Sequence, residues 1–505
     1  MTFCVTELDV PFNHCSNIDS HSNQAMSKEF SEEDIAVHDT PDDLWLAIND
    51  KVYDFTDFAP DHPGGAEIIY QYAGKDASDE YNSFHAPSLV QKALDAKYHL
   101  GSLKVSKSNK KKKESESRGQ AKTKTRGPNE RPPLRDIINL HDFENVASTA
   151  LAKKEWAYIS GGANDNLTRD ANASILGRIW LRPAVMRDVR TVNTTTELFG
   201  CNLQLPVYIS PTGAALTGGE QGELALAKGA AKTGIIQTLA TPSSFPHEDV
   251  LDVTPERAFF QLYVNKNRKL SEDLLKKVTK TGKIKAVFVT ADLPVVSKRE
   301  ADERVKSENA GPGEDWKGSG LARQTGSFID PSLNWDDITW LRAQVDVPIV
   351  IKGIQRWEDA KLAMQHDVQG IVLSNHGGRA ADTAPPAILL LLELHKNCPE
   401  VFNKLVVLVD GGFRRGSDVL KAICLGASAV GLGRPFAYSV GYGEDGVEHA
   451  FNILRDELET AMRLCGLTDL ADASPDYVNT SDVDHLVRVG GHPYARKVRR
   501  PGSKL

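Results

Sequence analysis

Eight short runs rich in apolar and β-branched residues recur in the C-terminal part of this 505-residue chain, with helical hydrophobic patterns between them. A strand-like run followed by a helix is the repeating unit of a parallel sheet. Eight such units within about 375 residues predict a closed α/β barrel of the (β/α)8 type. No Gly-x-Gly-x-x-Gly pattern follows any run, which argues against an open nicotinamide-binding sheet. The runs are residues 207–210, 235–240, 259–264, 286–292, 348–353, 370–377, 406–412 and 429–434.

A lysine-rich tract divides the chain. Residues 104–126 carry ten Lys or Arg against Glu114 and Glu116, although the whole chain has a net charge of −8. The tract is rich in Ser and Thr and has no aromatic residue, so we interpret it as a flexible linker and not as a nuclear signal or a nucleic-acid-binding patch. We therefore expect an N-terminal extension (1–26), a small module (27–103), a basic flexible linker (104–130) and a barrel domain (131–505).

The small module is acidic, with sixteen Asp or Glu against five Lys in residues 27–103. This charge favours a basic partner. Two strand-like runs, residues 44–48 and 52–55, are joined at the turn pair Asn49-Asp50, which predicts a hairpin.

Two histidines of this module, His62 and His85, each stand at a turn beside an apolar helix start. Two axial imidazoles across an apolar pocket leave no iron position open for oxygen, which suits electron transfer. The segments 45–56, 58–65 and 73–77 resemble a cytochrome b5-like domain, a small α+β haem-binding fold. That resemblance implies that His62 and His85 are the ligands of a haem b iron, and we favour it over a turn with a surface histidine.

Polar residues and glycines follow nearly every predicted barrel strand, at the rim where barrel enzymes carry their chemistry. Lys352 ends an otherwise apolar strand, and burying its ammonium is costly unless it serves an anion such as the N1 and O2 edge of a reduced flavin. Glycine N–H groups and guanidinium groups after the last two strands could hold a phosphate. These residues are Gly411, Gly412, Arg414, Gly433 and Arg434.

His376 lies at a strand end three residues before Arg379, so one loop could present a base and a carboxylate-binding group to a small 2-hydroxy acid. Arg299 could supply a second cation, and Asp292 could stabilise the imidazolium form of His376. Two tyrosines could hydrogen-bond the carboxylate or the hydroxyl of the substrate, namely Tyr158 and Tyr263.

Motifs along the whole domain resemble the FMN-dependent L-2-hydroxy acid oxidases and dehydrogenases, above all Ser374-Asn375-His376-Gly377-Gly378-Arg379. The resemblance implies that His376 is the base, with Asp292 and Tyr263 beside it. It also implies that Arg299 and Arg379 bind the carboxylate and that Tyr158 and Tyr263 contact the substrate. FMN would be held by Thr212, Gly213, Gln261, Thr290, Lys352, Asp410, Gly411, Gly412, Arg414, Gly433 and Arg434.

A cytochrome b5-like module joined to this barrel resembles the flavocytochrome b2 family of L-lactate dehydrogenases (cytochrome). The resemblance implies oxidation of an L-2-hydroxy acid, lactate by default, to the 2-keto acid through FMN. Electrons would then pass through haem b to a one-electron acceptor such as cytochrome c, and the protein would be a homotetramer. Whether His376 takes the hydroxyl proton during hydride transfer, or the Cα proton to give a carbanion, stays open.

Two departures from the family pattern concern the substrate pocket. The chain has Thr212-Gly213 where family members usually read Thr-Ala, and Ala240 stands where a hydroxyl is expected beside the flavin. Gly213 and Pro242 would reshape the side-chain pocket, so a longer or aromatic 2-hydroxy acid stays open.

The last three residues, Ser503-Lys504-Leu505, form the tripeptide read by the peroxisomal import receptor. Residues 1–30 contain Lys28 but no Arg, unlike a mitochondrial presequence. We therefore predict a peroxisomal protein. In addition, no apolar run in the sequence is long enough to cross a membrane. Cytochrome c-reducing members of the family work in the mitochondrial intermembrane space. This conflict leaves open a peroxisomal oxidase that uses oxygen and produces hydrogen peroxide.

Two other classes of function are less well supported. A redox-sensing haem protein with an inactive barrel would need a broken barrel site, yet His376, Arg379, Arg299 and Lys352 are all present. A nucleic-acid-binding protein acting through the basic tract would need strongly salt-dependent DNA binding.

The six cysteines are scattered without paired spacing, which favours a reducing compartment and makes redox chemistry depend on a cofactor.

Overall fold

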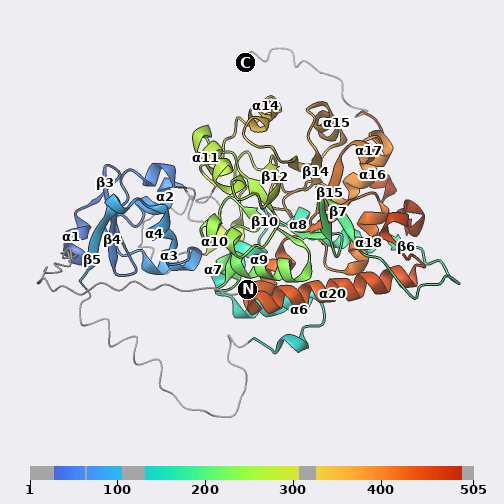
Figure 1. Ribbon diagram of the computed structural model, residues 1–505, viewed down its shortest axis with the longest axis horizontal. Coiled ribbons are helices and arrows are strands. Elements are labelled where there is room, and N and C mark those ends of the chain that lie inside the picture. The colour runs from blue at the N-terminus through green and yellow to red at the C-terminus, as the bar shows by residue number, and fades with distance from the viewer. Residues whose placement is uncertain (1–27, 63–64, 105–130, 306–325, 492–505) are drawn as a thin grey trace, which may run out of the picture.

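The computed structural model describes residues 28–62, 65–104, 131–305 and 326–491, which form a small module beside a larger barrel (Figure 1). The expected N-terminal extension, most of the expected linker and the C-terminal tripeptide lie outside the described residues.

The small module is built on a five-stranded sheet in the order β1-β5-β4-β3-β2. Its central hairpin confirms the prediction, because Asn49 and Asp50 both have positive φ, 53° and 61°, as a tight two-residue turn requires. Short helices pack against the sheet, so the module is an α+β unit. Its elements are β1 (Glu29–Phe30), α1 (Glu32–Ala36), β2 (Asp39–Thr40), β3 (Asp43–Ile48), β4 (Lys51–Asp54), η1 (Ala59–Asp61), α2 (Ala66–Tyr70), α3 (Ser78–Phe84), α4 (Leu89–Ala93), η2 (Ala96–Tyr98) and β5 (His99–Leu103).

The larger domain is a closed barrel of eight parallel strands, and the predicted (β/α)8 architecture is confirmed. Each predicted run overlaps one barrel strand, and the last strand pairs with the first through Val430 and Val207. The strands are β9 (Val207–Ile209), β10 (Ile236–Ala240), β11 (Ala258–Leu262), β12 (Ile284–Thr290), β13 (Ile349–Ile354), β14 (Gly370–Leu373), β15 (Val406–Asp410) and β16 (Ala429–Leu432).

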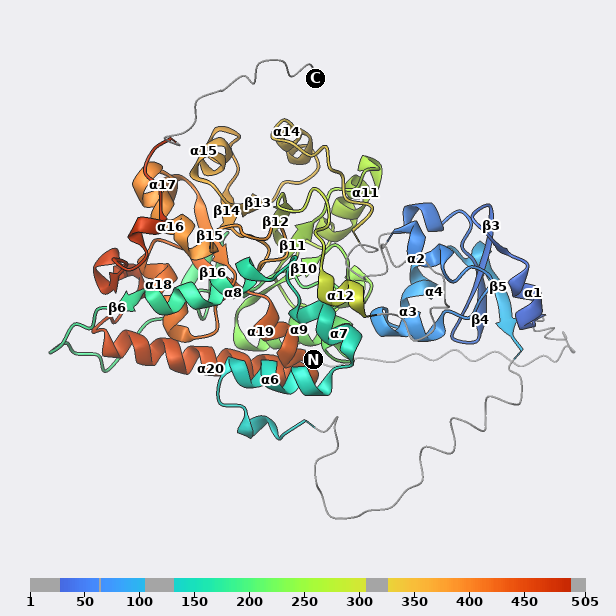
Figure 2. The same cartoon turned by 180° about the vertical axis from the view of Figure 1, so that it is seen from behind.

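Helices surround the barrel and also precede and follow it (Figures 1 and 2). None of the helices in the described ranges is both long and apolar enough to span a membrane. The main helices are α6 (Leu140–Ala150), α7 (Lys153–Ser160), α8 (Leu167–Ser174), α9 (Gly222–Thr233), α10 (His247–Asp252), α11 (Arg268–Thr279), α12 (Glu300–Arg304), α14 (Asp337–Arg342), α15 (Trp357–Gln365), α16 (Ala387–Asn397), α17 (Val401–Lys404), α18 (Gly416–Cys424), α19 (Arg434–Ser439) and α20 (Gly443–Leu464). Shorter pieces are η3 (Leu134–Asp136), η4 (Ile175–Arg178), η5 (Ala215–Gly218), η6 (Val440–Tyr442), η7 (Leu470–Asp472), η8 (Pro475–Tyr477), η9 (Asp484–Leu486) and strands β6 (Trp180–Leu181), β7 (Thr196–Leu198), β8 (Cys201–Leu203) and β17 (Val478–Asn479).

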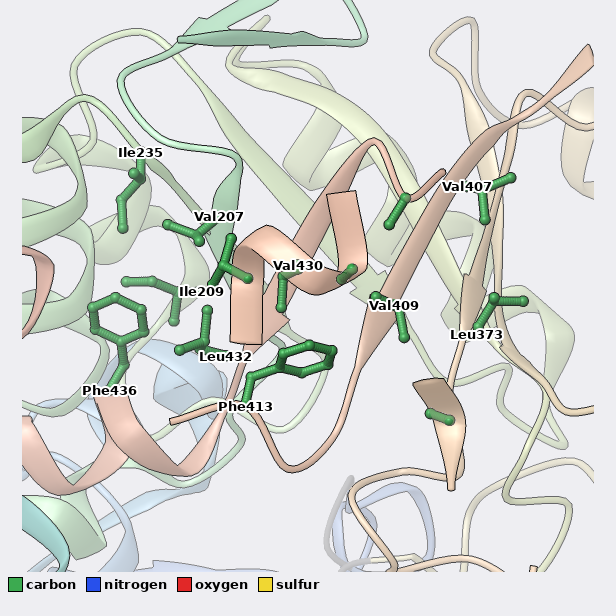
Figure 3. Packing of buried hydrophobic residues seen from close by; sticks show 14 of the residues in the cluster. Val207, Ile209, Ile235, Leu373, Val407, Val409, Phe413, Val430, Leu432 and Phe436 are labelled. Atoms are coloured by element: carbon green, nitrogen blue, oxygen red, sulfur yellow. The ribbon is translucent and has the colours of Figure 1, made fainter. Parts of the chain in front are cut away.

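Apolar side chains fill both the barrel interior and the layer between strands and helices. Inside the barrel, Phe259 and Phe288 stack with ring centroids 5.1 Å apart, and Tyr208 meets both rings edge-on. In the outer layer, side chains of the strands meet Phe413 and Phe436, which follow β15 and β16 (Figure 3). The barrel is therefore a packed core, and space for a ligand remains at its rim.

The small module docks at this rim, where α3 packs against η5, the turn that follows β9. The backbone N–H of Ala86 donates a hydrogen bond to the carbonyl oxygen of Ser244, at 2.9 Å. Two ion pairs cross the same boundary, one between Lys92 and Asp249 and one between Lys154 and Glu80. The residue next to His85 is thereby joined to the loop that follows β10.

Candidate active site

A cavity opens at the C-terminal ends of the barrel strands. Asp292 lies directly behind its wall, hydrogen-bonded to His376. Every other residue that the sequence assigned to substrate or FMN lines the cavity: Tyr158, Thr212, Gly213, Gln261, Tyr263, Thr290, Arg299, Lys352, His376, Arg379, Asp410, Gly411, Gly412, Arg414, Gly433 and Arg434.

His376 is held in one orientation by its neighbours. Its Nδ1 lies 2.8 Å from Oδ1 of the fully buried Asp292, and its Nε2 lies 3.3 Å from the hydroxyl of Tyr263. Since a carboxylate only accepts, Nδ1 carries the proton and Nε2 presents a lone pair. Burial keeps the pKa of His376 below its ordinary value, although Asp292 raises it. The imidazole is therefore a neutral base that can take a proton at Nε2.

Two guanidinium groups converge on the same cavity. Burial, and then the nearby charge of Arg379, lower the pKa of Arg299 to about 10, and Arg299 Nε has no hydrogen-bond partner among the described residues. Arg379 donates to the carbonyl oxygens of Gly161 and Tyr158 and stacks over the ring of Tyr158. A buried Arg299 with an unpaired donor beside the half-buried Arg379 fits a carboxylate ligand.

Lys352 lies deep in the cavity between two carboxylates. Its Nζ is 3.6 Å from Asp292 Oδ2 and 3.6 Å from Asp410 Oδ2. Burial alone would lower the pKa of Lys352, but the two carboxylates raise it above its ordinary value, so the ammonium persists. A permanent cation beside the cavity fits the electron-rich edge of a reduced flavin. Asp410 Oδ1 is buried without a hydrogen-bond partner among the described residues, which fits a hydroxyl donor such as the ribityl chain of FMN.

One wall of the cavity is a buried hydrogen-bond ladder. Gln261 Nε2 donates to Thr290 Oγ1 at 2.9 Å, and Thr241 N donates to Gln261 Oε1 at 3.1 Å. The Thr212 hydroxyl donates to the Ser210 carbonyl oxygen. Ala240 lines the cavity as expected, and the hydroxyl of Thr241 beside it donates to the Gln261 carbonyl oxygen.

The part of the cavity where the FMN phosphate is expected is lined by glycine backbone and by two arginines. A Cβ atom on Gly412 would lie 2.2 Å from the carbonyl oxygen of Asn172, and its φ is +90°, so only glycine fits there. The guanidinium of Arg434 donates to the carbonyl oxygens of Ile159, Gly377 and Gly161. Arg414 pairs with Glu144 at 3.1 Å. The two arginines thus line the cavity while paired with protein groups.

Pro242 occupies the space beside Gly213 that the methyl group of an alanine would need. A Cβ atom on Gly213 would lie 2.8 Å from Pro242 Cγ and 2.8 Å from the Pro242 carbonyl oxygen. The missing methyl group at position 213 therefore makes room for the proline ring and does not by itself enlarge the pocket.

In the small module, His62 and His85 face one another with ring centroids 6.2 Å apart. His62 Nδ1 donates to the Gly65 carbonyl oxygen at 3.0 Å, which leaves Nε2 free to bind a metal, and His85 Nδ1 has no hydrogen-bond partner among the described residues. Burial lowers the pKa of both imidazoles, that of His85 to about 3, so both are neutral, as a metal ligand must be. Pro63 and Gly64 lie outside the described residues.

Some residues around the cavity were not predicted from the sequence. They lie behind its polar wall or form its apolar wall. Ser374 belongs to the quoted motif, yet its contacts with Lys352 and His376 depend on folding. Glu223, buried in α9, accepts hydrogen bonds from the backbones of Ala215 and Ser244, and no motif marked it. The remaining apolar lining includes Leu293, Val296 and Ile329.

Comparison with known proteins supports both parts of the chain. The FMN-dependent dehydrogenase family matches residues 147–480, and the cytochrome b5-like haem/steroid binding domain matches residues 31–104. An L-lactate dehydrogenase (cytochrome) of Saccharomyces cerevisiae is 41% identical over 489 residues, which cover 93% of this chain and 83% of that protein. A solved mutant flavocytochrome b2 with pyruvate bound is 43% identical, with a TM-score of 0.65, and the match covers 72% of this chain and 91% of that one.

The prediction of a peroxisomal location is wrong, whereas the import receptor as a partner stays a prediction. A peroxisomal (S)-2-hydroxy-acid oxidase of Oryza sativa subsp. japonica is 38% identical but covers only 68% of this chain. The yeast relative, an L-lactate dehydrogenase (cytochrome), instead matches 93% of this chain, across both modules. The tripeptide that suggested the peroxisome lies outside the described residues.

A haem module and an FMN barrel on one chain define the type of oxidoreductase. The oxidase relative covers much less of the chain, so the cytochrome-linked dehydrogenase is the better match. The chain belongs to the FMN-dependent dehydrogenase family and is an FMN- and haem b-dependent L-2-hydroxy acid dehydrogenase of the flavocytochrome b2 type.

Proposed function

We propose that this chain oxidises L-lactate to pyruvate and passes the electrons to a cytochrome c. The observation that carries the proposal is the His376–Asp292 pair beside the buried Arg299 and the half-buried Arg379, in one cavity. When bound, FMN supplies a two-electron acceptor and haem b a one-electron relay. Since Pro242 fills the space beside Gly213, the pocket favours a small substrate side chain.

Each residue of the pair and each cation has a separate role. Arg299 and Arg379 bind the substrate carboxylate, and Tyr158 and Tyr263 contact the substrate from the cavity wall. His376 takes one proton at Nε2, whether that proton comes from the hydroxyl or from Cα. Asp292 stabilises the imidazolium that forms, because its carboxylate lies 2.8 Å from Nδ1.

The cofactors are held by two separate sets of residues. His62 and His85 ligate the haem iron. Lys352 supplies positive charge to the flavin edge, and the turns after β15 and β16 hold the phosphate. The FMN-binding set is Thr212, Gly213, Gln261, Thr290, Lys352, Asp410, Gly411, Gly412, Arg414, Gly433 and Arg434.

The acidic module favours a basic redox partner such as cytochrome c, through long-range electrostatic steering. We also propose that residues 104–130 act as a tether between the two modules and that the protein is a homotetramer. Light scattering of the purified holoenzyme tests the tetramer, and a monomer or dimer mass would contradict it.

Anaerobic stopped-flow mixing with L-lactate tests the reaction, because flavin bleaching and haem reduction have separate absorbance bands. We expect the flavin to bleach first and the haem bands to follow. His376→Gln should slow flavin bleaching by about 100-fold or more, as loss of a general base does. His62→Ala should abolish haem binding and leave flavin bleaching intact. Failure of every L-2-hydroxy acid in a short panel to bleach the flavin would reject the assignment.

Electron delivery is tested by adding cytochrome c or oxygen to the reduced enzyme. We expect reduction of cytochrome c to be fast and hydrogen peroxide formation to be slow. Peroxide formation as the main outcome would favour an oxidase.

A further inference from the structure

Ser374 lies directly after β14 and its side chain is fully buried, with 0% exposure. It does not line the cavity, so its side chain lies behind the residues that would contact substrate and flavin. Any effect of Ser374 on the reaction must therefore pass through the residues that its hydroxyl contacts.

The hydroxyl oxygen of Ser374 accepts two hydrogen bonds. Lys352 Nζ donates to it at 3.0 Å, and the backbone N–H of His376 donates to it at 3.0 Å. A serine hydroxyl has two acceptor lone pairs, so both are in use. The two donors belong to the flavin-side cation Lys352, on β13, and to the base His376, in the loop after β14.

For Lys352, the serine is the nearest polar partner. Both flanking carboxylates are 3.6 Å from Nζ, longer than the 3.0 Å contact to Ser374. The hydroxyl therefore sets where the ammonium stands between Asp292 and Asp410.

For His376, the serine supports an unusual backbone conformation. The φ angle of His376 is +59°, in the left-handed region that is unfavourable for residues other than glycine. The hydrogen bond from its N–H to Ser374 holds this turn, and the turn directs Nδ1 to Asp292.

We propose that Ser374 is a positioning residue that fixes the base His376 and the cation Lys352 together through one oxygen atom. The inference rests on the proposed roles of these two residues. Loss of the oxygen should displace both groups at once, whereas a purely structural serine would affect stability alone.

Ser374→Ala in the holoenzyme tests the proposal with two readouts. The first is the rate of flavin bleaching by L-lactate, which reports on His376. The second is the Kd of sulfite, followed by loss of the flavin absorbance band, which reports on how well Lys352 stabilises negative charge on the flavin. Each should worsen by about ten- to 100-fold, the factor expected for one charge-assisted hydrogen bond.

Ser439→Ala is the matched control, because Ser439 is equally buried and its hydroxyl donates to the Phe436 carbonyl oxygen. It should leave the bleaching rate and the sulfite Kd unchanged. If Ser374→Ala does not fold, Ser374→Cys keeps the size of the side chain, supplies only a weak acceptor and should shift both readouts in the same direction.

A wild-type value for either readout in a folded Ser374 variant would overturn the proposal. If the wild-type enzyme is not reduced by any 2-hydroxy acid, the proposed function fails. The sulfite titration would still test the effect of Ser374 on Lys352 in that case.

Discussion

Gly213 and Pro242 pack directly against each other in the pocket wall, so a Cβ atom at position 213 has no room. Gly213→Ala should push Pro242 and its carbonyl oxygen outward, since the new Cβ would lie 2.8 Å from both. We expect kcat/KM for L-lactate to fall about tenfold, the usual cost of overpacking. Steady-state assays with an artificial one-electron acceptor measure this effect. Gly177→Ala is the control, because its Cβ would meet nothing within 4 Å. An unchanged kcat/KM would show that Pro242 moves freely.

The pH dependence of the reaction depends on the balance of charges around His376. Burial lowers its pKa and Asp292 raises it, so the net pKa lies below the ordinary value of 6.5. Activity should therefore decline only as the pH falls below 6.5. Other charged or polar groups near the imidazole are Lys352, Arg299 and Tyr263.

Asp292→Asn removes the group that raises this pKa. The acidic decline of kcat should move to lower pH, and kcat should fall by about 100-fold because no carboxylate stabilises the imidazolium. A kcat–pH profile of the variant tests both effects, with the exposed Asp273→Asn as control. A shift of the decline to higher pH would contradict the assigned role of Asp292.

At the scale of elements, the turn η5 and the loop after β10 are joined by one carboxylate. Glu223 Oε1 accepts hydrogen bonds from Ala215 N and Ser244 N, each at 3.0 Å. The same loop receives the small module, because the Ser244 carbonyl oxygen accepts from Ala86 N. Burial raises the pKa of Glu223, so a neutral amide is a close substitute.

Glu223→Ala should loosen this docking surface without touching substrate. We expect haem reduction to slow about tenfold relative to flavin bleaching, because two buried N–H groups lose their acceptor. Glu223→Gln keeps the acceptor oxygen and should behave nearly as the wild type. Stopped-flow traces of both bands measure the ratio. An equal slowing of both bands by Glu223→Ala would place its effect in the barrel site and not in docking.

At the scale of the whole molecule, two ion pairs with different exposure join the barrel to the small module. The side chains of Glu80 and Lys154 are 17% and 24% exposed, whereas Lys92 is 54% exposed in its pair with Asp249. Lys154 Nζ also lies 4.9 Å from the centroid of the Phe84 ring. The Lys154 pair should therefore resist screening by salt better than the Lys92 pair.

Lys154→Ala should slow haem reduction more than Lys92→Ala, by a factor of up to about five. Raising the salt concentration should slow haem reduction in the wild type and leave flavin bleaching unchanged. Lys232→Ala is the matched control, because its pair with Glu448 lies within the barrel domain. A haem reduction rate independent of both salt and Lys154 would show that the ion pairs do not control docking of the module.

Patterns in the amino-acid sequence were enough to predict the barrel, the hairpin of the small module and most of the polar side chains that line the cavity. Local patterns suffice for these features, because β-branched runs and turn pairs specify strands and hairpins, and a closed barrel brings all strand ends to one rim. His376, Arg379 and Lys352 could be named for this reason. The terminal tripeptide was a poor guide to location, since three residues carry little information beside 93% coverage by a cytochrome-linked relative.

The hydrogen bonds and ion pairs between residues far apart in the chain could be identified only in the folded protein. Ser374 lies 22 residues from Lys352, Glu223 lies 21 residues from Ser244, and Lys154 lies 74 residues from Glu80. The structure likewise shows how Gly213 and Pro242 shape the pocket, because the proline packs closely against the glycine. These contacts join strands, loops and modules whose separations no local periodicity encodes, and burial then makes each shared hydrogen bond costly to lose.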